Sequence, residues 1–213
     1  MFGEIFSQNS GFSRFMNFLW NVIVISVLWF VCSIPLITIG AASTAAYYAM
    51  AKVVRHHTGA ASTEFFSAFR RNFKQATIFT VGYILVIFLL LLDCSLLYSG
   101  GTEDSMTLLC LIVALILMVV AHTQYLFPVL SRFEQSLFGH FRMAFVFVFR
   151  HLLTSIMVLV LLCAVLACIY LIPLSILFVP GLALYLQTFP MEKILRKYAP
   201  PASEEDADKW YNQ

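Results

Sequence analysis

One stretch of the sequence already indicates the solvent in which this chain folds. Residues 152–172 read LLTSIMVLVLLCAVLACIYLI and contain no charged side chain. A helix needs about 20 apolar residues to cross the hydrocarbon core of a bilayer, so this stretch is long enough to span a membrane. The whole chain has the same character, with 61% hydrophobic residues, 11% charged residues and a mean hydropathy of +0.88. We therefore expect an integral membrane protein.

Six such apolar segments are predicted from the absence of Lys and Arg and from the length that a span requires. They cover residues 15–36, 38–54, 76–98, 106–130, 152–172 and 174–189. Backbone groups in lipid must be bonded internally, and these runs lack the alternating pattern of barrel strands, so helices are expected. The predicted fold is all-α: a polytopic integral membrane helical bundle with about six transmembrane helices. It forms one transmembrane domain, 1–199, followed by a polar cytoplasmic tail, 200–213.

Proline and glycine mark two joins between neighbouring segments. Pro35 and Gly40 interrupt the first join, and Pro173, Pro180 and Gly181 interrupt the join between the last two segments. Proline lacks a backbone donor and ends or kinks helices, so each join is predicted to be a tight turn. The alternative at each place is one long kinked helix, which is too long for a core of roughly 30 Å.

The basic residues fall on one side of the bilayer if the chain crosses six times. They precede the first segment, lie at the end of the second segment or after it, follow the fourth and sixth segments, and are absent from the opposite turns: Arg14, Lys52, Arg55, Arg70, Arg71, Lys74, Arg132, Arg142, Arg150, Lys193, Arg196, Lys197 and Lys209. Positive loops stay in the cytoplasm, so both termini are predicted to be cytoplasmic.

Two of the basic connections have the pattern of amphipathic helices. Residues 62–74 and 137–149 both repeat Phe near the helical period, and each is predicted to lie in the membrane interface. The pattern FxxFRxxF occurs in both, which indicates either an internal repeat or a coincidence in a chain with 21 Phe residues. The candidate contacts to a partner or to lipid headgroups are Arg70, Arg71, Lys74, Arg142 and Arg150.

Polar residues within the predicted spans are the candidate functional positions. They are Asp93, His122, Gln124, Asn17 and Asn21. Asp93 is the only acidic residue in a predicted span, but it is close enough to the outer end of its segment to reach interfacial water. His122 and Gln124 are expected to bond to neighbouring helices, with a ligand or proton role as the alternative. The small residues of 40–46 predict a surface for close helix packing.

The sequence offers no catalytic constellation, so we do not expect an enzyme. There is no GxSxG, HExxH or phosphate-binding glycine loop. The five cysteines lie in apolar runs without metal-ligand spacing, so neither a metal nor a cofactor is predicted. A net charge of +2 gives no indication of nucleic acid binding.

Two stretches carry a resemblance to a known family. Residues 32–48 read CSIPLITIGAASTAAYY and residues 65–77 read FFSAFRRNFKQAT. In these stretches the chain resembles the bacterial YesL family. The resemblance implies a multi-pass protein of the bacterial cell membrane, often encoded beside carbohydrate ABC importers and glycan-degrading enzymes. The resemblance implies no catalytic residues in this chain.

Two functional hypotheses follow. The first is a non-catalytic accessory or assembly subunit of a carbohydrate ABC importer, whose partners are membrane lipids and the permease subunits. The second is a small solute transporter or channel acting by itself or as a homo-oligomer. Broken helices favour the second, whereas the scarcity of buried polar residues argues against it.

Overall fold

The computed structural model describes residues 11–100 and 105–199, and these residues form helices joined by short turns. No strand occurs among them, so the predicted all-α class is confirmed. The predicted polar tail, 200–213, lies outside the described residues. The elements are α2 (Gly11–Ser33), η1 (Leu36–Thr38), α3 (Ile39–Ala49), the π-helical turn η2 (Met50–Arg55), α4 (Ala61–Gly100), α5 (Ser105–Arg132), α6 (Leu137–Arg150), α7 (Leu152–Leu171), η3 (Pro173–Leu177) and α8 (Val179–Tyr198).

Four of the described helices are long and apolar enough to cross a membrane. They are α2, α4 over Ala61–Leu97, α5 over Met106–Arg132, and α7. These helices contain the predicted spans 15–36, 76–98, 106–130 and 152–172, apart from a few residues at the ends. The chain is therefore a helical membrane protein. The other two predicted spans correspond to α3 with η2 and to η3 with α8, so the count of six is not confirmed by the helices alone.

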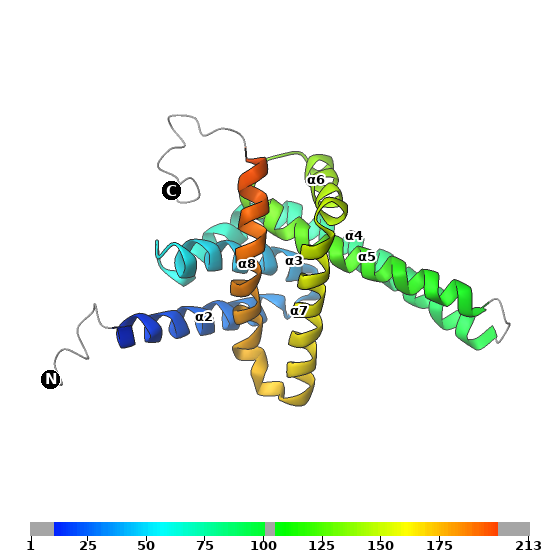
Figure 1. Cartoon of the computed structure of the whole chain (residues 1–213), viewed down its shortest axis with the longest axis horizontal. Coiled ribbons are helices and arrows are strands. Elements are labelled where there is room, and N and C mark those ends of the chain that lie inside the picture. Colours follow the sequence, from blue (N-terminus) through cyan, green and yellow to red (C-terminus); the bar gives the residue numbers. More distant parts are fainter. Residues whose placement is uncertain (1–10, 101–104, 200–213) are drawn as a thin grey trace.

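The two predicted turns are confirmed. After η1 the chain reverses, and α3 runs back along α2 (Figure 1). Between these two helices, Trp29 Nε1 donates a hydrogen bond to Ser43 Oγ at 3.1 Å. The turn is held by Thr38, whose hydroxyl lies 2.6 Å from the Cys32 carbonyl and 2.7 Å from the Pro35 carbonyl. The second turn, through η3, reverses the chain between α7 and α8.

The predicted interfacial helix at 62–74 is helical but is not a separate element, so it is not confirmed as an interfacial helix. It is the first part of α4, which continues without a break to Gly100. No proline or glycine lies between Ala61 and Thr80, so nothing in the sequence ends the helix there. At 1.5 Å per residue the 40 residues of α4 extend about 60 Å, twice the thickness of a hydrocarbon core.

The second segment predicted to be an interfacial helix, 137–149, forms a separate helix, α6. Ser136 caps its first turn by accepting a hydrogen bond from the Gly139 amide. Its inner face buries His140, Ala144 and Phe147, while a row of phenylalanines faces outward: Phe138, Phe141, Phe145 and Phe149. The outward row lies in the predicted register.

The last helix differs from its prediction. The segment 174–189 was expected to end before Pro190, but α8 begins at Val179 and continues through Pro190 to Tyr198. Met191, Ile194 and Leu195 are buried beyond the proline. Packing of these side chains offsets the hydrogen bond that Pro190 removes, so tertiary contacts override the local signal.

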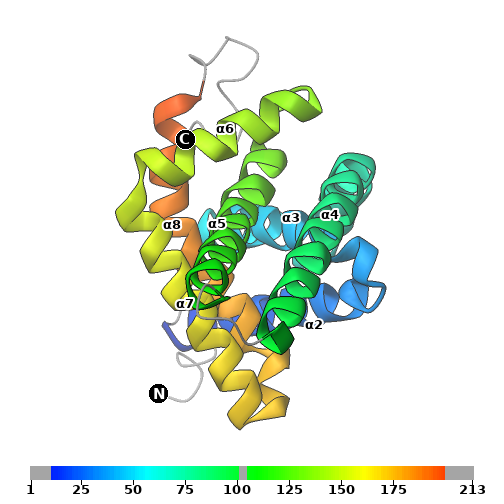
Figure 2. The same ribbon diagram turned by 90° about the vertical axis from the view of Figure 1, so that its right-hand side faces the viewer.

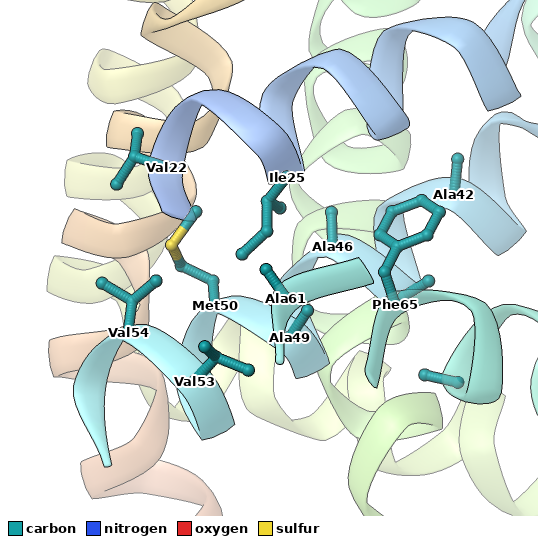
Figure 3. Close-up of a cluster of buried hydrophobic side chains, with 12 residues drawn as sticks. Val22, Ile25, Ala42, Ala46, Ala49, Met50, Val53, Val54, Ala61 and Phe65 are labelled. Carbon is teal, nitrogen blue, oxygen red and sulfur yellow. The ribbon is translucent and has the colours of Figure 1, made fainter. Parts of the chain in front are cut away.

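Small residues let α3 lie at the centre of the bundle. Figure 3 shows Ala42, Ala46 and Ala49 of α3 among side chains from α2, η2 and α4. A Cβ added to Gly40 would lie 2.0 Å from Thr80 Oγ1 and 2.6 Å from the Phe127 ring, so α3 touches both α4 and α5 there. The predicted packing surface at 40–46 is confirmed.

The outer parts of α4 and α5 extend beyond this bundle. We call Val81–Leu97 of α4 and Met106–Val120 of α5 the arm. Figure 1 shows the arm reaching away from α2, α3 and the α7–α8 hairpin, and Figure 2 views it nearly end-on. Ile112 is the one residue of the arm that is buried. The rest of its surface meets either lipid or another protein.

Candidate functional site

A buried ion pair and one hydrogen bond to it connect three helices. Arg132, at the end of α5, donates through Nη1 to Oε2 of Glu192 on α8. Both side chains are almost fully enclosed, with 3% and 1% of their surface exposed. Tyr47 on α3 donates its hydroxyl to the other carboxylate oxygen of Glu192 at 3.1 Å. The carboxylate therefore links α3, α5 and α8 through one group.

A buried charge pair of this kind holds the structure in one arrangement. Removing one partner leaves an uncompensated charge in a region of low dielectric, at a cost of about 3–5 kcal/mol. Arg55 of η2 adds a further link, because its Nη1 donates to the Thr188 carbonyl of α8 at 2.8 Å and its guanidinium lies 5.0 Å from the Phe189 ring centroid. We call Arg132, Glu192, Tyr47 and Arg55 the polar centre, which thus connects η2 as well.

Positively charged side chains lie around the polar centre. Burial lowers the pKa of His56, and the nearby Arg196 and Arg55 guanidinium groups lower it further. His151, between α6 and α7, has its pKa lowered by burial and by Lys197 and Arg150. Both imidazoles therefore favour the neutral form at the end of the molecule where the basic residues gather.

A proline in α5 makes a second link between α5 and α8. Pro128 has no N–H, so the Gln124 carbonyl lacks its partner within the helix. Gln187 of α8 supplies it, since its Nε2 donates to the Gln124 carbonyl at 3.1 Å and to Gln124 Oε1 at 3.4 Å. The predicted bond from Gln124 to a neighbouring helix is confirmed.

His122 connects three helices at the base of the arm. Its Nε2 lies 3.1 Å from the Phe141 carbonyl of α6, and its Nδ1 lies 2.5 Å from the Tyr83 hydroxyl of α4. A carbonyl can only accept, so Nε2 carries the proton and Nδ1 accepts from Tyr83. Both ring nitrogens are therefore used in a neutral imidazole, and the predicted role as a link between helices is confirmed.

The remaining predicted polar residues do not join these groups. Asp93 is exposed on the arm, in a different part of α4 from the residues that meet His122. Asn17 is exposed and Asn21 is half-buried on α2. Among the described residues, neither asparagine side chain makes a hydrogen bond to another helix.

The five predicted basic contacts all lie at the surface: Arg70, Arg71, Lys74, Arg142 and Arg150. Arg71 lies 5.0 Å from the ring centroid of Tyr48, and its Nη2 approaches the Ser131 carbonyl at 3.5 Å. Arg150 lies 5.4 Å from the Tyr198 ring centroid. The charged groups thus remain accessible to headgroups or to a partner, and two of them rest on aromatic rings.

A cavity of about 240 Å³ lies beside the buried ion pair. It is open on one side and lined by residues of α2, α3, α5, α7 and α8, and most of its wall is apolar. The polar side chains on its wall are Ser43, Tyr47, Thr123, Gln124 and Gln187. No lining residue is charged, because Tyr47 stands between the cavity and Glu192. Within the described residues no cluster of three His, Cys, Asp or Glu is placed to hold a metal ion.

The sequence prediction missed the ion pair. Glu192 lies beyond the predicted sixth span, and Arg132 was interpreted as part of a basic loop. A signal was present in the sequence, because Gln187, Met191, Ile194 and Leu195 repeat at helical spacing across Pro190. That pattern extends the helix and places Glu192 beside its apolar face.

Comparison with known proteins identifies the first part of the chain. A family model described as "Protein of unknown function, DUF624" matches residues 16–94. Over these residues the chain is similar to that family. The YesL proteins are the known membrane family with this domain, so the resemblance seen in the sequence is confirmed. No curated protein and no solved structure matches the chain.

The matched segment, residues 16–94, covers most of α2, all of α3 and η2, and most of α4. It supplies Tyr47 and Arg55 to the polar centre, whereas Arg132 and Glu192 come from the part of the chain that follows it. The buried network therefore connects the matched segment to α5 and α8.

Proposed function

We propose that this protein is a non-catalytic accessory or assembly subunit of the bacterial cell membrane that associates with the permease of a carbohydrate ABC importer. The arm carries the proposal: it consists of two long apolar helices that extend beyond the bundle (Figure 1), and Ile112 is its one buried residue. Helices in a membrane associate through van der Waals packing, and such a hairpin presents a continuous surface for that purpose. The importer as the partner follows from the YesL resemblance.

The polar groups of the bundle support a structural role. His122 bonds to Tyr83 and Phe141, Gln187 bonds to Gln124, and Glu192 bonds to Arg132. A conduit for polar solutes needs groups that face a continuous water-filled path. His122, Arg132 and Glu192 form bonds between helices instead, and Gln124 and Gln187 combine such a bond with a position on the cavity wall. The bundle thus resembles a scaffold more than a channel.

We also propose six crossings with both termini in the cytoplasm. The charge pattern supports this topology, since all 13 Lys and Arg residues then share one side. Figure 1 shows the α7–α8 hairpin running across the direction of α2, so the number of crossings rests on the charge pattern alone. Fusions of a cytoplasm-dependent fluorescent protein to each terminus test the orientation. Fluorescence from only one terminus would exclude an even number of crossings.

Site-specific photo-crosslinking in living cells tests the association. A photoreactive residue at Phe88 of the arm is expected to form an adduct with an importer permease subunit, identified by mass spectrometry. The matched control is Leu153 of α7, which is at least as exposed but lies outside the arm. Adducts only with lipid at both positions, together with unchanged sugar uptake after deletion of the gene, would contradict the proposal.

The cavity favours a second candidate, a small solute transporter acting alone or as an oligomer. Three of its polar side chains, Thr123, Gln124 and Gln187, lie on α5 and α8, two helices that contain proline, as expected for a site between broken helices. Solute flux into liposomes containing only this protein would support it. Flux that is absent from these liposomes but present when the importer is included would favour the accessory role.

A further inference from the structure

The hydrogen bonds around the cavity leave unused polar atoms on its wall. Gln187 uses its Nε2 on Gln124, and among the described residues its Oε1 accepts no hydrogen bond. Gln124 accepts through both of its oxygens, and its Nε2 donates to no described residue. Ser43 accepts from Trp29, and its own proton is not donated within the described part of the chain.

These atoms offer both donors and an acceptor inside a mostly apolar space. An amide donor and an amide acceptor lie on a facing pair of glutamines, with a hydroxyl donor on α3. A ligand hydroxyl matches this set because it can donate and accept at once. A charged ligand does not match, since no lining residue carries a charge and burial of an unpaired charge is costly. The remainder of the wall, which includes Phe127, Leu162 and Val165, suits a hydrocarbon chain.

We propose that this cavity binds a small neutral amphiphile, with a hydroxyl head against Gln124 and Gln187 and an apolar chain along α7. Its volume of about 240 Å³ lies below the roughly 300–1,000 Å³ of pockets that hold drug-sized ligands, so the ligand is a short-chain molecule. Binding here does not require the association with an importer, because every lining residue belongs to this chain.

Photolabelling with a diazirine derivative of 1-octanol tests the site. The full-length protein is placed in phosphatidylcholine liposomes, irradiated with the probe, and digested for mass spectrometry. Adducts are expected on cavity-lining residues, and unlabelled octanol is expected to remove them. Octane lacks the head and octanoate carries a charge, so both should compete at least fivefold less well. Equal competition by octane would overturn the assigned hydroxyl contact and the proposal with it.

A pair of tryptophan variants on one helix separates the cavity from the lipid-facing surface. Leu162→Trp fills the cavity from α7 and is expected to reduce cavity labelling at least fivefold. Val160→Trp adds the same group on the exposed side of α7, where 62% of the side chain is accessible, and should leave labelling unchanged. Labelling that falls equally in both variants, or only on lipid-facing residues, would overturn the proposal.

A variant that removes a polar group tests the contact to the ligand hydroxyl without filling the cavity. Gln124→Leu removes the unused amide donor but keeps the backbone carbonyl that Gln187 contacts. Octanol should then bind about fivefold more weakly, as expected for one lost hydrogen bond. Octane binding should not weaken. Mass spectrometry of protein extracted gently from cells distinguishes two sources of the ligand. A neutral lipid that remains bound indicates that the ligand comes from the bilayer. Uptake of added octanol by ligand-free protein indicates that it comes from the aqueous phase.

Discussion

The inner and outer parts of α4 and α5 belong to the same two helices but have opposite surroundings. Toward the bundle, α4 buries Phe65, Ala68, Asn72, Ala76 and Thr80, and α5 is mostly buried from Ala121 onward. In the arm, Ile112 is the single buried residue. Composition contributes to this difference, because the inner part of α4 contains Arg70, Arg71 and Lys74 whereas the only charged residue of the arm is Asp93. The inner part differs in that small and polar side chains make specific contacts there.

The comparison shows what each part needs for its stability. A helix in lipid satisfies its own backbone, so the arm remains helical without tertiary contacts. The bundle gains little from burying apolar groups, because lipid is equally apolar. Close packing at Gly40 and the bonds of Glu192, Gln187 and His122 therefore determine how its helices fit together. Substitutions should be costly in the bundle and nearly silent in the arm.

The largest effect is expected at the buried ion pair. Arg132→Met leaves Glu192 charged and unpaired among α3, α5 and α8, and should lower the free energy of unfolding by about 3–5 kcal/mol. Denaturation of the purified protein in mixed detergent measures this loss. The double variant Arg132→Met with Glu192→Met removes both charges and should recover most of the stability. A double variant as unstable as the sum of the two single variants would show that the pair is not coupled.

Two glycines on neighbouring helices provide the sharpest comparison. Gly40→Ala places a Cβ 2.0 Å from Thr80 Oγ1, so α3 must move, and a loss of about 1–3 kcal/mol is expected. Gly82→Ala on the arm meets nothing within 4 Å and should be neutral or slightly stabilising. The same detergent denaturation compares them. A clear loss from Gly82→Ala would mean that the arm packs on a second copy of the chain.

The apolar helices could be predicted from the sequence, because length and hydropathy are local properties. The predicted 106–130 and 152–172 lie within a few residues of α5 and α7. The errors occur where local signals compete with tertiary contacts: α8 continues through Pro190, and α4 joins a predicted interfacial helix to a span. His122 and Gln124 could be selected as polar residues in apolar runs, but their partners could not.

The ion pair was beyond local prediction for a physical reason. Arg132 and Glu192 are 60 residues apart, and each lies in a sequence context typical of a cytoplasmic loop. Only the antiparallel return of α8 along α7 brings them together. Hydropathy alone therefore locates helices but does not show which helix ends meet.

The boundary between the two parts is expected to show an intermediate effect. Tyr83 bonds to His122 where the arm leaves the bundle, so Tyr83→Phe removes one hydrogen bond and leaves the ring in place. The free energy of unfolding should fall by about 0.5–1.5 kcal/mol. Because the bond to Tyr83 is then already absent, His122→Ala should cost less in the Tyr83→Phe background than in the wild-type chain, where it also removes that bond. Independent, additive losses would contradict the assigned bond.

The smallest effect is expected at Asp93, although an acidic residue in a predicted span is the most conspicuous polar feature of the sequence. Its side chain is exposed on the arm and belongs to no buried network. Asp93→Asn should therefore leave the unfolding transition in detergent unchanged, and it should not alter labelling of the cavity. If the protein moves a solute, the carboxylate is a candidate for coupling. Loss of flux in liposomes with unchanged stability would then favour the transporter over the accessory subunit, and the arm would have a function of its own.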